Sequence, residues 1–218
     1  MLRILISDDH AMFAMFVRMW LEQASSRLGI PLECLPVATS GAETLASVQA
    51  HKPDILIQDM QLADMNGLDI ISVLRPTMPT LKIFVLSGRP DWARAAIDAG
   101  ANGCMLKEDK PQVIEQILTW DTSAAVWISP ALGEKFYVAN RELLRYNFTH
   151  SELSILRLLH LGNGEIADAL GLSEGTIRNT MSTIYQKTNI ANRAELLNWA
   201  QNVLLLLSLP VSVAKKSS

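Results

Sequence analysis

The sequence contains little cysteine and has no long apolar run. Only 2 cysteines occur among 218 residues, and Cys34 and Cys104 lie in apolar segments without the spacing of metal ligands. We therefore expect two buried, reduced thiols and no disulfide. The most apolar segment, residues 203–209, is far shorter than the roughly 20 residues that a membrane-spanning helix needs. The sequence therefore predicts a protein without membrane spans.

The N-terminal segment also lacks the apolar core and the small-residue cleavage site of a secretion signal. We therefore expect a cytoplasmic protein. With 49% hydrophobic and 19% charged residues, the composition excludes a disordered chain or a coiled coil and is typical of globular proteins. A chain of 218 residues is long enough for two compact domains.

Charge is distributed unevenly along the chain. Acidic residues outnumber basic ones in residues 1–120, whereas basic residues slightly outnumber acidic ones in residues 141–218. This asymmetry is compatible with a regulatory domain followed by an anion-binding domain, although the basic excess alone is a weak signal for nucleic-acid binding.

In the first half, short apolar runs alternate with amphipathic segments of helical period. The runs are residues 2–7, 32–38, 55–58, 83–86 and 103–106, and the amphipathic segments are residues 13–23, 42–49, 68–74, 92–99 and 112–120. This alternation predicts an α/β domain with five parallel strands and helices on both faces.

Five polar residues follow these predicted strands: Asp8, Asp9, Asp59, Ser87 and Lys107. In an open parallel sheet, ligands gather at the carboxyl ends of the strands, so these residues are expected to meet at one edge. Singly, each has a plainer explanation as a turn, helix-cap or surface residue. Together, and in this order, they favour a functional site.

The residue types suit phosphorylation of a carboxylate. Both the phosphoryl donor and a carboxylate nucleophile are anionic, so a divalent cation such as Mg²⁺ is needed between them. The expected metal ligands are Asp8, Asp9, Asp59 and the backbone carbonyl of Gln61. Asp59 is also the expected nucleophile, while the Ser87 hydroxyl and the Lys107 ammonium are expected to contact phosphoryl oxygens.

These residues lie in segments that resemble the receiver domain of two-component response regulators. The segments are residues 4–10 (ILISDDH), 53–60 (PDILIQDM), 66–68 (NGL), 85–88 (VLSG) and 99–107 (AGANGCMLK). The resemblance covers about the first 120 residues and implies a flavodoxin-like fold with five strands. It also implies that a sensor histidine kinase phosphorylates Asp59.

One position departs from the receiver pattern. Cys104 stands where the family usually has tyrosine or phenylalanine, whose ring turns inward when the residue matching Ser87 is drawn toward the phosphoryl group. Ser87 and Cys104 are thus the switch positions. A different output surface, or weak coupling to phosphorylation, stays open as an alternative.

We predict a receiver domain over residues 1–121, a partly helical linker over 122–146, a helical domain over 147–209 and a flexible tail over 210–218. In the helical domain, Thr149 and Glu152 have the spacing of a capping box, and residues 165–170 form a short second helix. Ser173 caps a third helix, with Ile177, Met181 and Ile184 on one apolar face.

This pattern predicts a helix-turn-helix, whose second helix enters the major groove of DNA. Arg178, Asn179 and Ser182 point away from the apolar face, and arginine and asparagine are suited to guanine and adenine. By periodicity alone, a small helical bundle with a solvated polar face is an equally good interpretation.

Residues 166–178 (IADALGLSEGTIR), 184–187 (IYQK) and 192–196 (NRAEL) resemble the LuxR-type DNA-binding domain. The resemblance implies an all-α domain of four helices. It implies that Arg178, Asn179 and Ser182 face bases, that Thr176 and Lys187 lie near phosphates, and that the fourth helix, about residues 193–205, pairs two monomers.

Together these features predict a response regulator of the NarL/FixJ type: a sensor kinase phosphorylates Asp59, and a homodimer binds promoter DNA. Because basic residues are few in the recognition region, we expect modest affinity per monomer. One alternative is an atypical regulator controlled by dimerisation or a partner. The other is a Mg²⁺-dependent phosphatase, which the absence of a second carboxylate near Asp59 and the attached helical domain disfavour.

Overall fold

The computed structural model describes residues 1–120 and 126–204. The chain forms two compact units, Met1–Gly133 and a second that begins at Glu134. This division lies inside one helix, α6 (Pro130–Tyr146), within the segment 122–146 for which the sequence predicts a partly helical linker. The predicted tail over 210–218 and part of the apolar segment 203–209 lie outside the described residues.

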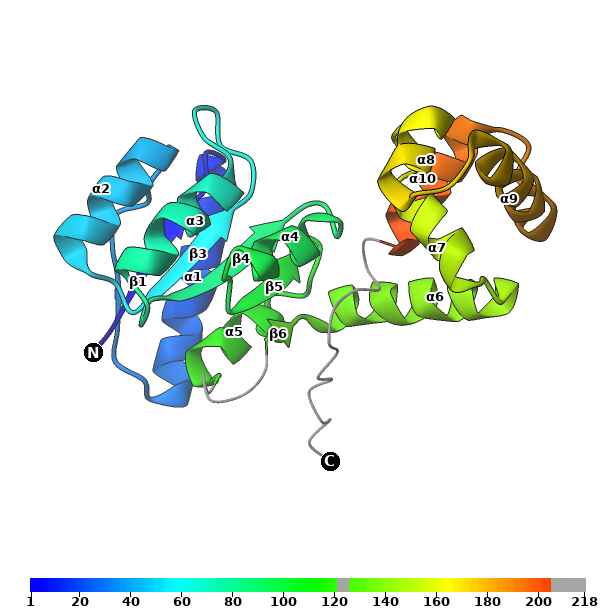
Figure 1. Cartoon of the computed structure of the whole chain (residues 1–218). Helices are drawn as coiled ribbons and strands as arrows, with labels where there is room; N and C mark the ends of the chain where they lie inside the picture. The colour runs from blue at the N-terminus through cyan, green and yellow to red at the C-terminus, as the bar shows by residue number, and fades with distance from the viewer. Residues whose placement is uncertain (121–125, 205–218) are drawn as a thin grey trace. The chain divides into compact units, whose positions relative to one another are not determined.

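The first unit is built on a parallel sheet with the strand order β2-β1-β3-β4-β5-β6 (Figure 1). The strands are β1 (Leu2–Ser7), β2 (Leu32–Cys34), β3 (Ile55–Asp59), β4 (Lys82–Ser87), β5 (Gly103–Leu106) and β6 (Trp127–Ile128). Every residue of β3 and β5 is buried, as expected for central strands covered by helices on both faces.

Five helices connect and cover these strands: α1 (Ala11–Leu28), α2 (Gly41–His51), α3 (Gly67–Thr77), α4 (Trp92–Asp98) and α5 (Gln112–Thr119). Helices α1 and α5 contact each other on one face, whereas α2, α3 and α4 follow one another on the opposite face (Figure 1). The predicted doubly wound α/β domain is confirmed.

Within the described part of the chain, the sheet has six strands instead of the five predicted. Strand β6 pairs in parallel with β5, with Trp127 beside Gly103 and Ile128 beside Cys104. The Trp127 ring packs edge-on against Phe84, with 5.9 Å between ring centroids. A strand of two residues is too short to show an alternating pattern, so only its tertiary pairing reveals it.

The second unit is all-α. After α6 come α7 (His150–Arg157), α8 (Asn163–Leu170), α9 (Glu174–Thr188) and α10 (Arg193–Leu204). The predicted capping box at α7 is present, because Thr149 Oγ1 accepts from the Glu152 N–H and the Glu152 carboxylate accepts from the Thr149 N–H. Helix α8 begins at Asn163, two residues before the predicted start, because the Glu165 carboxylate accepts from the Gly162 N–H and caps the helix there.

Apolar residues from α7 to α10 form one core, which includes Ile155, Ile166, Ile177, Ile184 and Leu196. The sequence-predicted face of α9 is thus the buried face. Among the residues described, no helix has the length and apolar character required to cross a bilayer.

Candidate phosphorylation site and DNA-binding helix

Three of the predicted carboxylates meet at the carboxyl edge of the sheet. Asp8 and Asp9 follow β1, and Asp59 ends β3. One ligand atom from each of these residues, together with one from His10, lies within 4.8 Å of all the others. Asp8 and Asp59 are buried, whereas Asp9 is exposed. Three carboxylate groups at this spacing are a donor set that fits Mg²⁺.

Lys107 links two of these carboxylates. Its Nζ lies 2.8 Å from Asp8 Oδ2 and 2.9 Å from Asp59 Oδ2, and it sits over the Phe13 ring at 4.9 Å from the centroid. Lys107 directly follows β5, so strands β1, β3 and β5 each supply one member of this ion-pair network.

Burial and charge act in opposite directions on these groups. Burial raises the pKa of Asp59 above its usual range, and the bonds from Lys107 only partly offset that effect. For Lys107, burial lowers the pKa, but the two carboxylates outweigh it and leave the pKa raised. The ammonium therefore stays charged at neutral pH and stabilises the ionised carboxylates.

Ser87 ends β4 and is buried beside the site. Its Oγ accepts from the Arg89 N–H at 3.1 Å. The Arg89 guanidinium pairs with Asp91 and lies 5.9 Å from the centroid of the Trp92 ring at the start of α4. The Ser87 hydroxyl is therefore tied to the turn that leads into α4.

Cys104 lies in β5 with its side chain buried toward α4. Its thiol donates to the Ala93 carbonyl at 3.6 Å, and burial raises its pKa to about 12. Neither cysteine is in a disulfide, as predicted, although Cys34 is only partly buried. The position expected to carry an aromatic switch residue thus holds a small, neutral side chain packed against a helix backbone.

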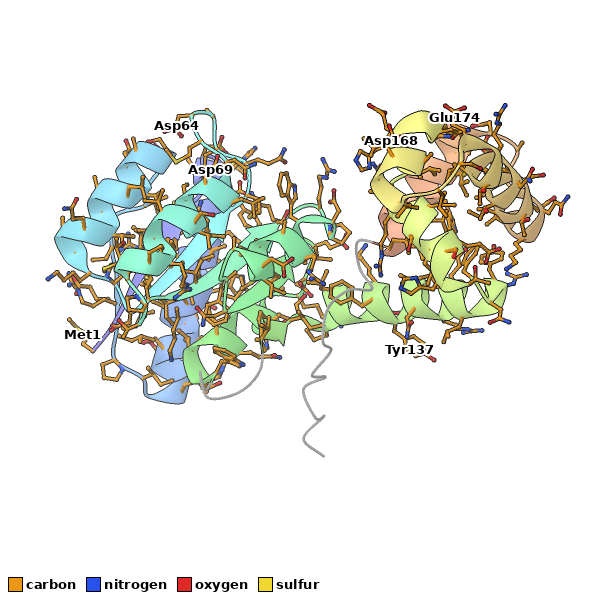
Figure 2. All side chains as sticks on the ribbon, viewed as in Figure 1. Met1, Asp64, Asp69, Tyr137, Asp168 and Glu174 are labelled. Carbon is orange, nitrogen blue, oxygen red and sulfur yellow. The ribbon has the colours of Figure 1, made fainter. Side chains whose placement is uncertain are left out.

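Two residues near the site were not singled out from the sequence. His10 Nδ1 lies 2.8 Å from Asp9 Oδ1, and the His10 N–H donates to Asp8 Oδ1 at 2.8 Å. Its position directly after Asp8 and Asp9 was the available signal. Asp64, at the tip of the loop between β3 and α3 (Figure 2), accepts from the Gly41 and Ala42 N–H groups and so caps α2.

That loop also approaches the backbone of Asp59 and Met60 closely. The Gly67 N–H donates to the Met60 carbonyl at 3.0 Å. A Cβ at Gly67 would lie 2.7 Å from the Asp59 carbonyl oxygen and 2.9 Å from Met60 Cα. Residue 67 therefore has no room for a side chain. For Gln61, the backbone N–H bonds to the Asp59 carboxylate.

In the second unit, α9 presents the predicted polar residues to solvent. Ser173 Oγ accepts from the Thr176 N–H at 3.1 Å and caps the helix, with Glu174 in its first turn (Figure 2). Ile177, Met181 and Ile184 are buried, whereas Thr176, Arg178, Asn179 and Ser182 are exposed. The Arg178 guanidinium lies 3.7 Å from the Glu174 carboxylate, a long ion-pair contact.

Lys187 differs from these residues, because it is held inside its own domain. Its Nζ lies 2.7 Å from Glu152 Oε2 and 3.3 Å from the Asn147 carbonyl. The structure thus separates Lys187, which ties α9 to α7, from the exposed residues of α9.

Known proteins with the same two parts are similar to this chain. Residues 4–119 match the response regulator receiver domain, and residues 146–200 match the luxR family of bacterial regulatory proteins. The nitrate/nitrite response regulator protein NarP of Escherichia coli is 28% identical over 201 residues, covering 88% of this chain and 90% of NarP. The transcriptional regulatory protein DesR of Bacillus subtilis is 27% identical, covering 89% of this chain and 94% of DesR.

Solved structures of the RcsB response regulator of Salmonella typhimurium share the fold. One has a TM-score of 0.63 at 21% identity and covers 91% of this chain and 98% of RcsB. The family and these relatives are transcription regulators, so the phosphatase alternative is not supported. The chain belongs to the response regulator receiver-domain family, and its luxR-family second domain makes it a DNA-binding two-component response regulator of the NarL/FixJ type.

Proposed function

We propose that this response regulator is switched by phosphorylation of Asp59 and then binds promoter DNA as a homodimer in the bacterial cytoplasm. The observation that carries the proposal is the site at the sheet edge, where Asp59 lies beside Asp8 and Asp9 and its carboxylate is bonded to Lys107. A buried carboxylate among metal-binding oxygens and one fixed cation is suited to accept a phosphoryl group.

In the transfer, a carboxylate oxygen of Asp59 forms a bond to phosphorus while the bond from phosphorus to the kinase histidine breaks. Asp8, Asp9, Asp59 and the Gln61 carbonyl would hold Mg²⁺, which when bound offsets the repulsion between the two anions. Lys107 provides a second positive charge, and Ser87 provides a hydroxyl for a phosphoryl oxygen. Asp59 supplies the nucleophile, and Lys107 favours its ionised form.

DNA recognition is assigned to α9. Arg178, Asn179 and Ser182 are exposed on it and face base edges in the major groove, while Thr176 lies near the phosphate backbone. Lys187 is bonded to Glu152, so it approaches a phosphate either from this bonded position or after the bond breaks. Helix α10 provides the pairing surface between two monomers. RcsB, which shares the fold, has been solved bound to promoter DNA with a phosphoryl mimic.

The switch must act by shifting a population between two conformations. The Ser87 hydroxyl can donate to a phosphoryl oxygen while it still accepts from the Arg89 N–H, so movement of Ser87 toward the phosphoryl group pulls first on the turn before α4. The buried Cys104 has no ring to follow this movement. That observation favours a second candidate function, DNA binding controlled by dimerisation or a partner independently of phosphorylation.

The test is labelling with a small phosphodonor in Mg²⁺, followed by DNA binding at a stated salt concentration. Asp59→Asn should abolish labelling, whereas Asp98→Asn, which changes an exposed carboxylate on α4, should leave it intact. Stoichiometric labelling of Asp59→Asn would refute the assigned acceptor. Equal DNA affinity with and without phosphodonor would instead support the second candidate.

A further inference from the structure

We infer that Gln58 is a positioning residue for phosphorylation: its buried side-chain amide fixes the backbone of Asp59 relative to strand β1, which carries Asp8. This inference rests on the proposed phosphorylation of Asp59. Gln58 directly precedes the acceptor, and its side chain has no exposed surface. A fully buried glutamine in the middle of an apolar strand requires a partner for each polar atom or a functional reason for its presence.

The amide group contacts both strands of the site. Gln58 Nε2 lies 2.7 Å from the Asp59 carbonyl oxygen and 3.1 Å from Ser7 Oγ. Ser7 directly precedes Asp8, and Ser7 and Gln58 are paired in the register of β1 and β3. The bond thus joins the two residues that immediately precede the metal-binding and phosphoacceptor aspartates.

The network continues to helix α2. Ser7 Oγ lies 2.6 Å from Thr44 Oγ1, which is 2.8 Å from the Ser40 carbonyl. Ser40 is also the N-cap of α2, and both Ser7 and Thr44 are buried. One side-chain network therefore connects the acceptor strand, the metal-binding strand and the start of a helix.

Only one assignment of donors and acceptors satisfies this network. The Ser40 carbonyl can only accept, so Thr44 donates its single proton there and accepts from Ser7. Ser7 then has only lone pairs left for Gln58, which donates one Nε2 proton to Ser7 and the other to the Asp59 carbonyl. Since both acceptors require a donor, the amide cannot be flipped.

This orientation leaves the Gln58 Oε1 atom buried without a hydrogen-bond partner among the described residues. An unpaired buried acceptor lowers stability. The Gln58 side chain therefore contributes less to the free energy of unfolding than an apolar side chain of the same length would. Its two donated hydrogen bonds position the site in spite of this loss of stability.

Gly67 also restricts the Asp59 carbonyl. Gly67 approaches it so closely that a Cβ there would lie 2.7 Å from the carbonyl oxygen. With Gln58 bonded to the same oxygen, the acceptor backbone has little freedom. These two contacts fix the position of the Asp59 backbone from which the side chain extends. The Asp59 carboxylate must stay at a constant distance from Asp8 and Lys107 during attack on phosphorus.

The test compares Gln58→Met, whose side chain has similar length but no donors, with the unaltered chain. Phosphorylation is followed with acetyl phosphate over a range of concentrations at saturating Mg²⁺, and rates are expressed per folded molecule. We expect the maximal rate to fall about 10-fold, as is typical when groups that orient a ligand are removed. The half-saturating acetyl phosphate concentration should stay unchanged, and the melting temperature should be equal or higher.

Ser7→Ala is a second variant, which removes the hydroxyl that bonds to Gln58 and Thr44 but leaves the Gln58 amide in place. Its rate should fall less than that of Gln58→Met, and the double variant should be no slower than Gln58→Met alone, because both changes act on one unit. Ser25→Ala, which removes the bond from Ser25 Oγ to the Ile30 carbonyl in the same domain, is the matched control and should keep the full rate.

An unchanged maximal rate in Gln58→Met, with the unaltered chain labelled at Asp59, would overturn the positioning role alone. If Gln58→Met does not fold, an unchanged rate in Ser7→Ala would overturn it instead. Absence of labelling in the unaltered chain would overturn the proposed function and this inference together.

Discussion

The ammonium of Lys187 lies 2.7 Å from the carboxylate of Glu152, and this pair joins α9 to α7. Glu152 is buried, and it also completes the capping box with Thr149. The Glu152 carboxylate thus caps the start of α7 and binds the Lys187 ammonium of α9. The sequence predicts that Lys187 lies near DNA phosphates. In the structure, its bond to Glu152 holds α9 in place within the domain.

Lys187→Met should destabilise the second domain by about 1–3 kcal/mol, because it leaves the buried Glu152 carboxylate without its cation. Calorimetric unfolding of the full chain measures this change. Arg178→Met, on the same helix, is the matched control and should change stability by less than about 0.5 kcal/mol, since Arg178 is exposed. Equal effects of the two variants would contradict the structural role of Lys187.

The stability of the second domain should decrease in acid through Glu152. Burial raises the pKa of this carboxyl, but the bonds from Lys187 and Thr149 outweigh it, so the pKa lies below the ordinary 4.5. A group with a lowered pKa in the folded state stabilises fully above its unfolded value and loses this contribution as the pH falls through its folded value.

Melting temperatures measured against pH for the unaltered chain and for Glu152→Gln check this dependence. The difference between them should be largest above the ordinary pKa of 4.5 and should shrink as the pH falls below it. A constant difference across that range would show that the Glu152 charge does not stabilise the fold.

Gly67→Ala should damage the phosphorylation site from the loop side. The added Cβ meets the Asp59 carbonyl and Met60 Cα, which are backbone atoms and cannot move aside cheaply. We expect a loss of about 1–3 kcal/mol in stability and slower labelling of Asp59.

Gly133→Ala, within α6, is the control for Gly67→Ala. Its nearest neighbour would be Ile128 Cδ1 at 3.9 Å. Because alanine favours a helix over glycine, this control should stabilise the chain by about 0.5–1 kcal/mol. Labelling at the full rate in Gly67→Ala would show that the close approach does not constrain the acceptor.

Arg178→Ala should weaken binding to the preferred DNA by about 1–3 kcal/mol and relax the preference at one base pair. The melting temperature should not change, because Arg178 is exposed. Arg157→Ala removes an exposed arginine from α7 and should leave the base preference intact. Competition binding to a library of sites at fixed salt separates the two, and equal loss on all sequences would assign Arg178 to phosphate contact.

The periodic elements were predictable from the sequence because each is long enough to show its pattern. The run Ile55 to Ile57 is apolar and is followed by Gln58 and the acid Asp59, and the face of Ile177, Met181 and Ile184 has helical spacing. Strand β6 was missed because two residues carry no period. The start of α8 was placed late, since the carboxylate of Glu165 supplies the cap that Gly162 lacks.

The two domains, the helix-turn-helix and the identity of the residues at the sheet edge follow from the amino-acid sequence, because local patterns encode strands, helices and caps. Which atoms meet is specified by the folded chain. It placed Lys107 between Asp8 and Asp59, paired Lys187 with Glu152, and bonded Gln58 to Ser7 and to the Asp59 backbone. These contacts join residues far apart in the chain, and their geometry depends on strand register and burial, which no local pattern specifies.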